Sequence, residues 1–119
     1  MSRLKVLFHV NEEEKWNTAL ANVTNLFKDV GDGAADVVVL ANGPSVKAYV
    51  DSGKLKVMEE LARKGALFLA CRNSLKKMCE EQTGACVNES TLPDFVKVVP
   101  AGVTEIIKRQ MDGFAYIKP

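Results

Sequence analysis

The feature that most constrains the fold is a regular alternation of short apolar runs with longer segments of helical periodicity. The runs are rich in β-branched and aromatic residues, and those at 36–41 and 66–70 are almost continuously apolar. Strands that are covered on both faces of a sheet have this composition. The sequence therefore predicts strands at 4–10, 36–41, 66–70, 96–99 and 114–117.

Helical periodicity follows every run except the last. Apolar residues recur three and four positions apart from Trp16 to Val30, and Asn11 with Glu14 three residues later predicts the N-cap of that helix. Pro44 predicts the first turn of a short helix that reaches Val50. Further helices are expected at about 55–65, from the residues after Cys71 to about 83, and at 103–113.

Strands that alternate with helices in this way predict an α/β fold. We expect a five-stranded, mainly parallel sheet with helices on both faces, as in a flavodoxin-like three-layer sandwich. The 119 residues contain no internal repeat, linker or low-complexity tract, so a single domain over 1–119 is expected.

The composition restricts which partners and which cellular location we expect. Lys and Arg number 16 and Asp and Glu 15, and no basic stripe is interleaved with aromatic residues, so no nucleic-acid partner is expected. No segment approaches the roughly 18 consecutive apolar residues of a membrane span, and the N-terminus lacks the apolar core of a signal peptide. We therefore expect a cytoplasmic protein without a membrane partner, in which cysteines are free thiols.

Cys71 lies between an apolar strand and a predicted helix, at the edge of the sheet where ligands of open parallel sheets bind. Backbone N–H groups at a helix N-terminus and nearby cations, here Arg72, Lys76 and Lys77, favour the thiolate that attacks sulfur. A cysteine at the end of a buried strand is also common as an inert small hydrophobe. Both interpretations stay open at this point.

The other cysteines and the single histidine allow several roles. Cys79 shares a predicted helix face with apolar residues, which predicts a core position. Cys86 is either a resolving thiol for Cys71, a second sulfur acceptor or a residue without a role. His9 either lowers the pKa of the Cys71 thiol or is a strand-end histidine that the backbone satisfies. The cysteine spacings fit no zinc motif and contain no C-x-x-C, so neither a metal nor a cofactor is expected.

Other α/β classes lack their defining residues in this chain. A flavodoxin would carry a phosphate loop after the first strand, where this chain has three glutamates at 12–14. A receiver domain would carry an aspartate after the third strand, where this chain has Cys71. A cysteine phosphatase would combine C-x5-R with a cysteine after the first strand, whereas here Lys77 occupies the arginine position.

Several segments together resemble the DsrE/DsrF-like family of small sulfur-relay proteins, especially its short stand-alone members. The segments cover nearly the whole chain and lie at 5–10, 41–44, 70–75, 98–103 and 113–119. The resemblance implies a parallel five-stranded fold, assembly into trimers or hexamers, and a cysteine after the third strand that carries sulfur as a persulfide. That catalytic role transfers to Cys71 alone.

The sequence thus predicts a sulfur-carrier or sulfurtransferase-like protein that accepts sulfane sulfur on Cys71 and passes it to a partner thiol. Sulfur-donor and sulfur-acceptor proteins are the expected partners. His9, Asn42, Gly43 and Asn73 follow or end the strands and are the expected residues of the pocket that binds the persulfide anion. The alternative is a non-catalytic oligomeric module for small-ligand binding or regulation, with Cys71 lining a pocket between subunits.

The end of the chain also favours a homo-oligomer. Phe114, Tyr116 and Ile117 form an apolar terminal strand that a small monomer could cover only poorly. An uncovered apolar edge favours pairing with a neighbouring copy.

Overall fold

The computed structural model describes residues 3–81 and 87–119 of the chain. The strands are β1 (Leu4–Val10), β2 (Ala35–Ala41), β3 (Ala66–Cys71), β4 (Val96–Val99) and β5 (Ala115–Ile117). The α-helices are α1 (Trp16–Val30), α2 (Ser52–Arg63), α3 (Arg72–Glu81) and α4 (Gly102–Met111). Three short 3-10 helices are η1 (Glu13–Lys15), η2 (Gly43–Val50) and η3 (Glu89–Thr91). Every predicted strand forms, with its bounds shifted by at most one residue.

The strands make one sheet in the order β4-β3-β2-β1-β5. β1 pairs with β2 along its whole length, and β5 joins the other edge of β1. β3 lies between β2 and β4. All these pairs are parallel, which confirms the predicted α/β fold.

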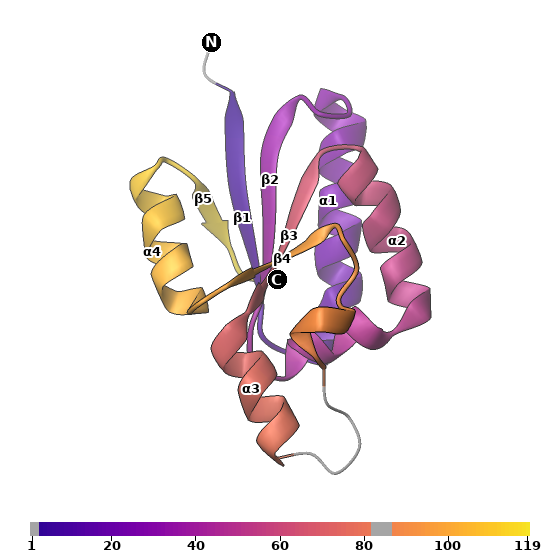
Figure 1. Ribbon diagram of the computed structural model, residues 1–119. Helices are drawn as coiled ribbons and strands as arrows, with labels where there is room; N and C mark the ends of the chain where they lie inside the picture. The colour runs from indigo at the N-terminus through magenta and orange to yellow at the C-terminus, as the bar shows by residue number, and fades with distance from the viewer. Residues whose placement is uncertain (1–2, 82–86) are drawn as a thin grey trace.

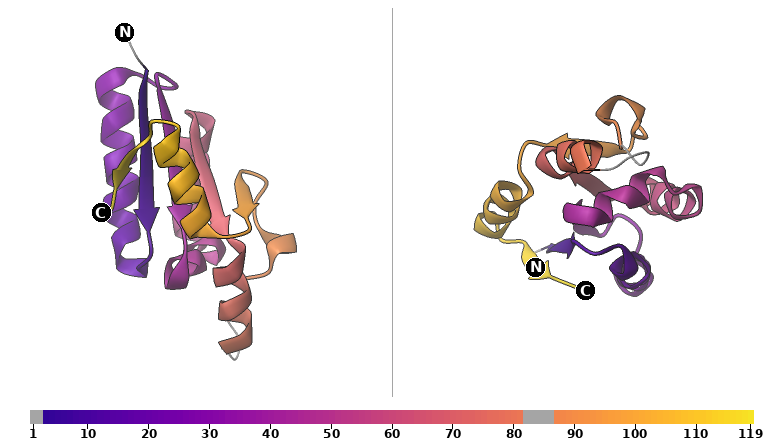
Figure 2. Two further views of the ribbon diagram at one scale, coloured as in Figure 1. Left: turned by 90° about the vertical axis from the view of Figure 1, so that its left-hand side faces the viewer. Right: turned by 90° about the horizontal axis from the view of Figure 1, so that it is seen from below.

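Helices cover both faces of the sheet (Figures 1 and 2). Side chains alternate between the faces of a strand, so Val6 and Phe8 of β1 point to one face while Leu7 points to the other. α1 and α2 cover the face of Val6, and α4 covers the face of Leu7. α3 extends beyond the carboxyl ends of the strands (Figure 1).

The face beneath α1 and α2 holds the larger core. Trp16 at the start of α1 is fully buried, and its Nε1–H donates to the Ser45 carbonyl oxygen at 2.8 Å. Its ring meets Tyr49 edge-on at 5.7 Å and lies 6.5 Å from Phe68 of β3. α3 adds buried apolar side chains to the same cluster. This packing ties β3, and the residues at its end, firmly to the rest of the sheet.

The face beneath α4 holds a much smaller cluster. Leu7, Val38, Leu40 and Leu69 are buried there, and Ile106 of α4 packs on them only partly buried. Within the described residues, α4 is the α-helix that covers this face, and it has ten residues.

Two predicted helix starts are wrong. Asn11 does not cap the first helix, because η1 intervenes and the cap position before η1 is Glu12 in an extended conformation. The second long helix begins at Ser52, not near 55, because the Asp51 carboxylate accepts from the N–H groups of Gly53 and Lys54. Among the described helices, none is long and apolar enough to cross a membrane.

Candidate functional site

The candidate site lies at the carboxyl ends of β1, β2 and β3, next to the first turn of α4. Cys71 is the last residue of β3 and lies opposite Val99 of β4. From β3 the chain enters α3, which packs with the larger core, whereas from β4 it enters α4 on the opposite face. Adjacent strands whose connections leave to opposite faces create the crevice in which open α/β sheets bind ligands.

Cys71 is a free cysteine and only 5% exposed. The backbone N–H of Gly102, the first residue of α4, donates to its Sγ at 3.3 Å. Burial raises the pKa of the Cys71 thiol, but hydrogen bonds from the Ser74 hydroxyl and from the backbone N–H groups of Ser74, Gly102 and Asn73 lower it more. The net pKa lies below the ordinary thiol value, so the site favours the thiolate.

Ser74 connects Cys71 to the turn after β2. Its Oγ accepts from the Gly43 N–H at 2.7 Å. Gly43 has φ +60, and a side chain on it would also lie 3.3 Å from the Asn11 carbonyl oxygen. Glycine is required here because this left-handed conformation strains other residues. The Gly43 N–H therefore donates to the Ser74 hydroxyl oxygen, and not to the Cys71 sulfur.

His9 connects β5 to β2. Its Nε2 lies 2.9 Å from Asn42 Oδ1, and its Nδ1 lies 2.5 Å from the Tyr116 hydroxyl. Asn42 Oδ1 can only accept, so Nε2 donates to it, and in the neutral tautomer with that proton Nδ1 accepts from the Tyr116 O–H. His9 is therefore satisfied by two side chains, and not by backbone as the simpler expectation had it.

Asn42 approaches Cys71 across Gly102. An ideal Cβ built on Gly102 would lie 3.4 Å from both Cβ and Nδ2 of Asn42 and 3.5 Å from the Cys71 Cβ. The structure thus brings the predicted site residues together at one place. They are joined by hydrogen bonds or lie in contact with the residues that are, and they are His9, Asn42, Gly43, Cys71 and Asn73.

The cations expected near Cys71 do not explain its lowered pKa. Arg72 forms a two-fold hydrogen-bonded ion pair with Glu89 of η3, at 2.9 and 3.0 Å. That pair raises the pKa of Arg72 and lowers that of Glu89, and it offsets the charge of Arg72 locally. Hydrogen bonds, rather than nearby positive charge, favour the thiolate of Cys71.

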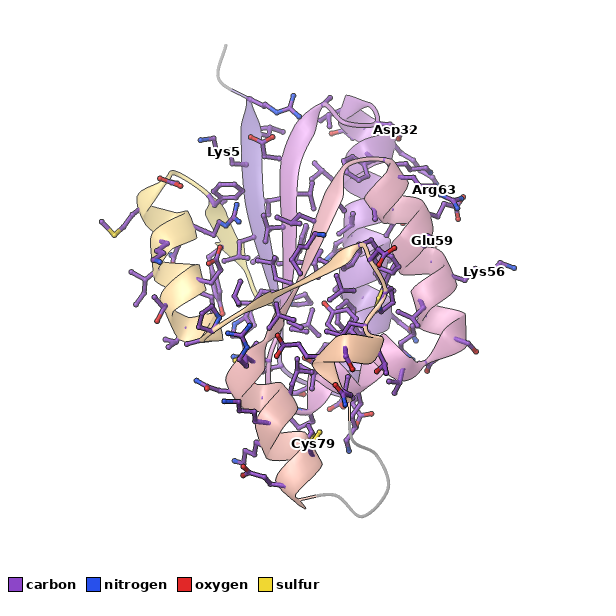
Figure 3. All side chains as sticks on the ribbon, viewed as in Figure 1. Lys5, Asp32, Lys56, Glu59, Arg63 and Cys79 are labelled. Carbon is purple, nitrogen blue, oxygen red and sulfur yellow. The ribbon has the colours of Figure 1, made fainter. Side chains whose placement is uncertain are left out.

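The expectation of free thiols is wrong for Cys79, which is disulfide-bonded. Cys79 lies toward the end of α3 that is remote from β3 (Figure 3). Cys86, the predicted resolving thiol, lies outside the described residues. Within 3–81 and 87–119, no group of three or more His, Cys, Asp or Glu side chains could hold a metal ion.

Tyr116, Ser74 and Gly102 contribute to the site but were not predicted as site residues. The strand-end rule points to the segments that hold Ser74 and Gly102 but does not single out these two residues. Tyr116 could be found only by knowing that β5 pairs with β1, which puts Tyr116 opposite Leu7 and on the face of His9. Burial raises the pKa of Tyr116, so its hydroxyl keeps its proton for His9.

The sequence matches no model of a protein family and no curated protein. Among solved structures, it is similar to a protein of unknown function, MTH1491 from Methanobacterium thermoautotrophicum, with 30% sequence identity and a TM-score of 0.79. The match covers 98% of this chain and 99% of the other. The likeness therefore extends over the whole fold, including the strand ends that carry the candidate site.

Proposed function

This chain belongs to the same family as MTH1491 of Methanobacterium thermoautotrophicum, and we propose that it carries sulfane sulfur as a persulfide on Cys71. The observation that carries the proposal is the set of hydrogen bonds to the Cys71 sulfur, which lowers the thiol pKa despite burial. A thiolate is the nucleophile of thiol and persulfide exchange. A lowered pKa increases the fraction of that form at neutral pH.

The proposed cycle has two exchange steps. The Cys71 thiolate attacks the outer sulfur of a donor persulfide R–S–SH, the donor S–S bond breaks, and R–S⁻ leaves with Cys71–S–SH formed. An acceptor thiolate R′–S⁻ then attacks the outer sulfur of Cys71–S–SH, the S–S bond of the Cys71 persulfide breaks, and R′–S–SH forms while the Cys71 thiolate is restored. Each step forms one S–S bond and breaks another, so no oxidant or reductant is consumed.

The resemblance to DsrE/DsrF-like sulfur-relay proteins supports this proposal. The cysteine that carries sulfur in those proteins follows the third strand, and Cys71 is the last residue of the third strand here. By the same resemblance we propose sulfur-donor and sulfur-acceptor proteins as partners. By the same resemblance the cytoplasm is the proposed location, with the disulfide of Cys79 as an exception to the reduced thiols of that compartment.

We also propose a homo-oligomer, a trimer or a hexamer. Val103, Ile107 and Met111 form a stripe along α4 in which they are 65, 53 and 82% exposed. On the terminal strand, Tyr116 and Ile117 are 39 and 40% exposed. Exposed apolar surfaces of this kind favour contact with another protein chain. The stripe on α4 is also close to the candidate site, because α4 starts beside Cys71. Sedimentation of the wild type as a monomer at micromolar concentration would contradict this part, and Ile107→Glu should weaken the assembly.

Intact mass spectrometry tests the carrier function. After incubation with inorganic polysulfide, the wild type should gain mass in steps of one sulfur atom, and reductant should reverse the gain. Cys71→Ser should show no such gain in intact mass. Equal uptake by Cys71→Ser would contradict the proposal.

The burial of Cys71 favours a second candidate function, a non-catalytic oligomeric module in which Cys71 lines a pocket between subunits. A side chain only 5% exposed is poorly accessible to a large sulfur donor. Alkylation by iodoacetamide at neutral pH separates the two functions. A carrier thiolate should react fast, whereas a structural thiol should react slowly even though the reagent is small.

A further inference from the structure

The sheet extends one strand beyond its helical cover on the face of α1 and α2. α1 packs on β1 and β2, and α2 packs on β3, whereas β5 lies at the edge beyond α1 (Figure 2). A groove of about 630 Å³ therefore runs between α1 and β5, with β1 at its base. Its apolar lining consists of Leu4, Val6, Phe8, Leu26, Ala115 and Ile117.

A single negative charge borders this groove among the described residues. The polar lining consists of Asn22, Asn25 and Asp29 of α1, and only Asp29 is charged. Within 3–81 and 87–119, its carboxylate forms no ion pair or hydrogen bond. α1 connects two parallel neighbouring strands and so runs antiparallel to β1, which puts Asp29 at the Leu4 end of the groove. The groove is thus apolar along its length and negative where β1 begins.

The exposed stripe on α4 matches this groove in length and in polarity. Val103, Ile107 and Met111 are four residues apart, so they form one row along the outer side of the helix. The row is about 12 Å long, and the base of the groove from Leu4 to Phe8 is about 13 Å long. Rows of this spacing are how amphipathic helices bind in apolar grooves.

The stripe also has a positive charge at one end. Lys108 lies three residues before Met111 and is exposed beside the row. Its ammonium group forms no ion pair or hydrogen bond in the part of the chain that the structure describes. An unpaired cation therefore flanks the stripe, as an unpaired anion flanks the groove.

The stripe and the groove lie on opposite faces of the sheet, so they cannot meet within one chain. Two different surfaces that fit one another on separate copies make a head-to-tail contact, which closes into a ring when the rotation allows. α4 runs antiparallel to the strands (Figure 1), and rotation about an axis along the strands keeps that direction in every copy. In such a ring the end of the stripe with Lys108 meets the end of the groove with Asp29.

We propose that the α4 stripe of one copy binds in the groove between α1 and β5 of the next copy, with Lys108 paired to Asp29. This inference rests on the homo-oligomer part of the proposed function and does not depend on Cys71. Each copy supplies one stripe and one groove, so the same contact repeats around the ring.

Two single variants test the two surfaces. Ile107→Glu places a charge in the stripe, and Ile117→Glu places one in the groove, so each should prevent the contact. At the micromolar concentration at which the wild type assembles, each variant should sediment as a monomer with wild-type circular dichroism. Val57→Glu on α2 is the matched control, because Val57 is 42% exposed and belongs to neither surface. It should assemble like the wild type.

Mixing the two variants distinguishes a head-to-tail contact from a contact between identical surfaces. Ile107→Glu keeps an intact groove and Ile117→Glu keeps an intact stripe, so an equimolar mixture should sediment as a one-to-one dimer. A contact between two stripes would leave Ile117→Glu assembled on its own, and a contact between two terminal strands would leave Ile107→Glu assembled. Either result would overturn the docking, while the homo-oligomer would stand.

Exchange of the two charges supplies an independent test on exposed side chains, which spares the core. Asp29→Lys and Lys108→Glu each bring like charges together, so each should raise the dissociation constant of the assembly about tenfold. The double variant should return to the wild-type value. A double variant that assembles no better than either single one would show that Lys108 does not meet Asp29, and would overturn the proposed orientation. If the wild type is a monomer, this inference and the homo-oligomer both fall, while sulfur uptake by Cys71 is decided by its own mass measurement.

Discussion

The two faces of the sheet differ in how they are covered and in what they carry. The face beneath α1 and α2 is closed by a large apolar cluster that includes Trp16, Tyr49 and Phe68. The opposite face is covered by α4 and a small cluster of buried leucine and valine side chains. The polar side chains of His9 and Cys71 both belong to strand positions that face α4.

The difference separates stability from chemistry. Buried apolar area supplies most of the folding free energy, and here most of it lies on one face. The thinly covered face can then hold groups that pack less well, such as a hydrogen-bonded histidine and a thiolate. The following predictions test whether the two roles are divided in this way, from the largest expected effect to the smallest.

Trp16→Ala should have the largest effect on stability. The change removes a fully buried ring with two aromatic neighbours and leaves the Ser45 carbonyl without its donor. The free energy of unfolding should fall by about 3 to 5 kcal/mol. Denaturant titration measures the loss, and Ile106→Ala on α4 is the control, with an expected loss of about 1 kcal/mol. Similar losses for the two variants would contradict the division between the faces.

Tyr49→Phe should change the pH dependence of stability. The Tyr49 hydroxyl is buried and donates to the Leu69 carbonyl oxygen at 2.9 Å. Its loss should cost about 1 kcal/mol near neutral pH. Burial raises the pKa of Tyr49 well above the ordinary value, so the folded state keeps a proton that the unfolded state loses above pH of about 10.

The contribution of Tyr49 is therefore complete below the ordinary tyrosine pKa and is lost as the pH rises above it. Between pH of about 9 and 11, the wild type should lose more free energy of unfolding than Tyr49→Phe, with a limiting slope of about 1.4 kcal/mol per pH unit. Parallel stability curves for the two proteins would show that the hydroxyl ionises in the folded state.

Ser74→Ala acts mainly on the site, and it should cost only about 1 kcal/mol of stability, because it removes the acceptor of the Gly43 N–H. The hydroxyl of Ser74 is the strongest contributor that lowers the pKa of Cys71 against the effect of burial. Its removal should raise that pKa and slow alkylation by iodoacetamide at neutral pH several-fold, roughly the effect of one lost hydrogen bond to a charged group. Ser90→Ala in η3 is the control, and an unchanged rate in Ser74→Ala would remove Ser74 from the account.

Tyr116→Phe should have the smallest effect. The variant keeps the ring beside His9 and removes only the hydroxyl that holds Nδ1. We expect a change of about twofold in the rate of sulfur release from loaded Cys71, since Asn42 keeps its hydrogen bond to His9. No change in stopped-flow release rates would mean that Asn42 is positioned without Tyr116.

The strands, and the edge of the sheet that holds the candidate site, could be predicted from the sequence because both depend on local composition. An apolar run such as 66–70 can be read without knowing its neighbours, and the strand-end rule then indicates Cys71. The pairing of Arg72 with Glu89 and of His9 with Tyr116 could not be predicted, because each joins residues far apart in the chain. The disulfide of Cys79 was not predicted, because the expectation of free thiols came from the redox state of the proposed compartment. That rule describes cysteines in general and does not decide the state of one cysteine.

The most direct test of the account is the titration of the Cys71 thiol. The thiolate absorbance of the wild type, minus that of Cys71→Ser, should give a midpoint below the ordinary cysteine pKa. The reason is that hydrogen bonds from Ser74, Gly102 and Asn73 outweigh the burial that raises this pKa. A midpoint at or above the ordinary value would mean that burial prevails, that Cys71 is a structural thiol, and that the thinly covered face does not hold a sulfur carrier.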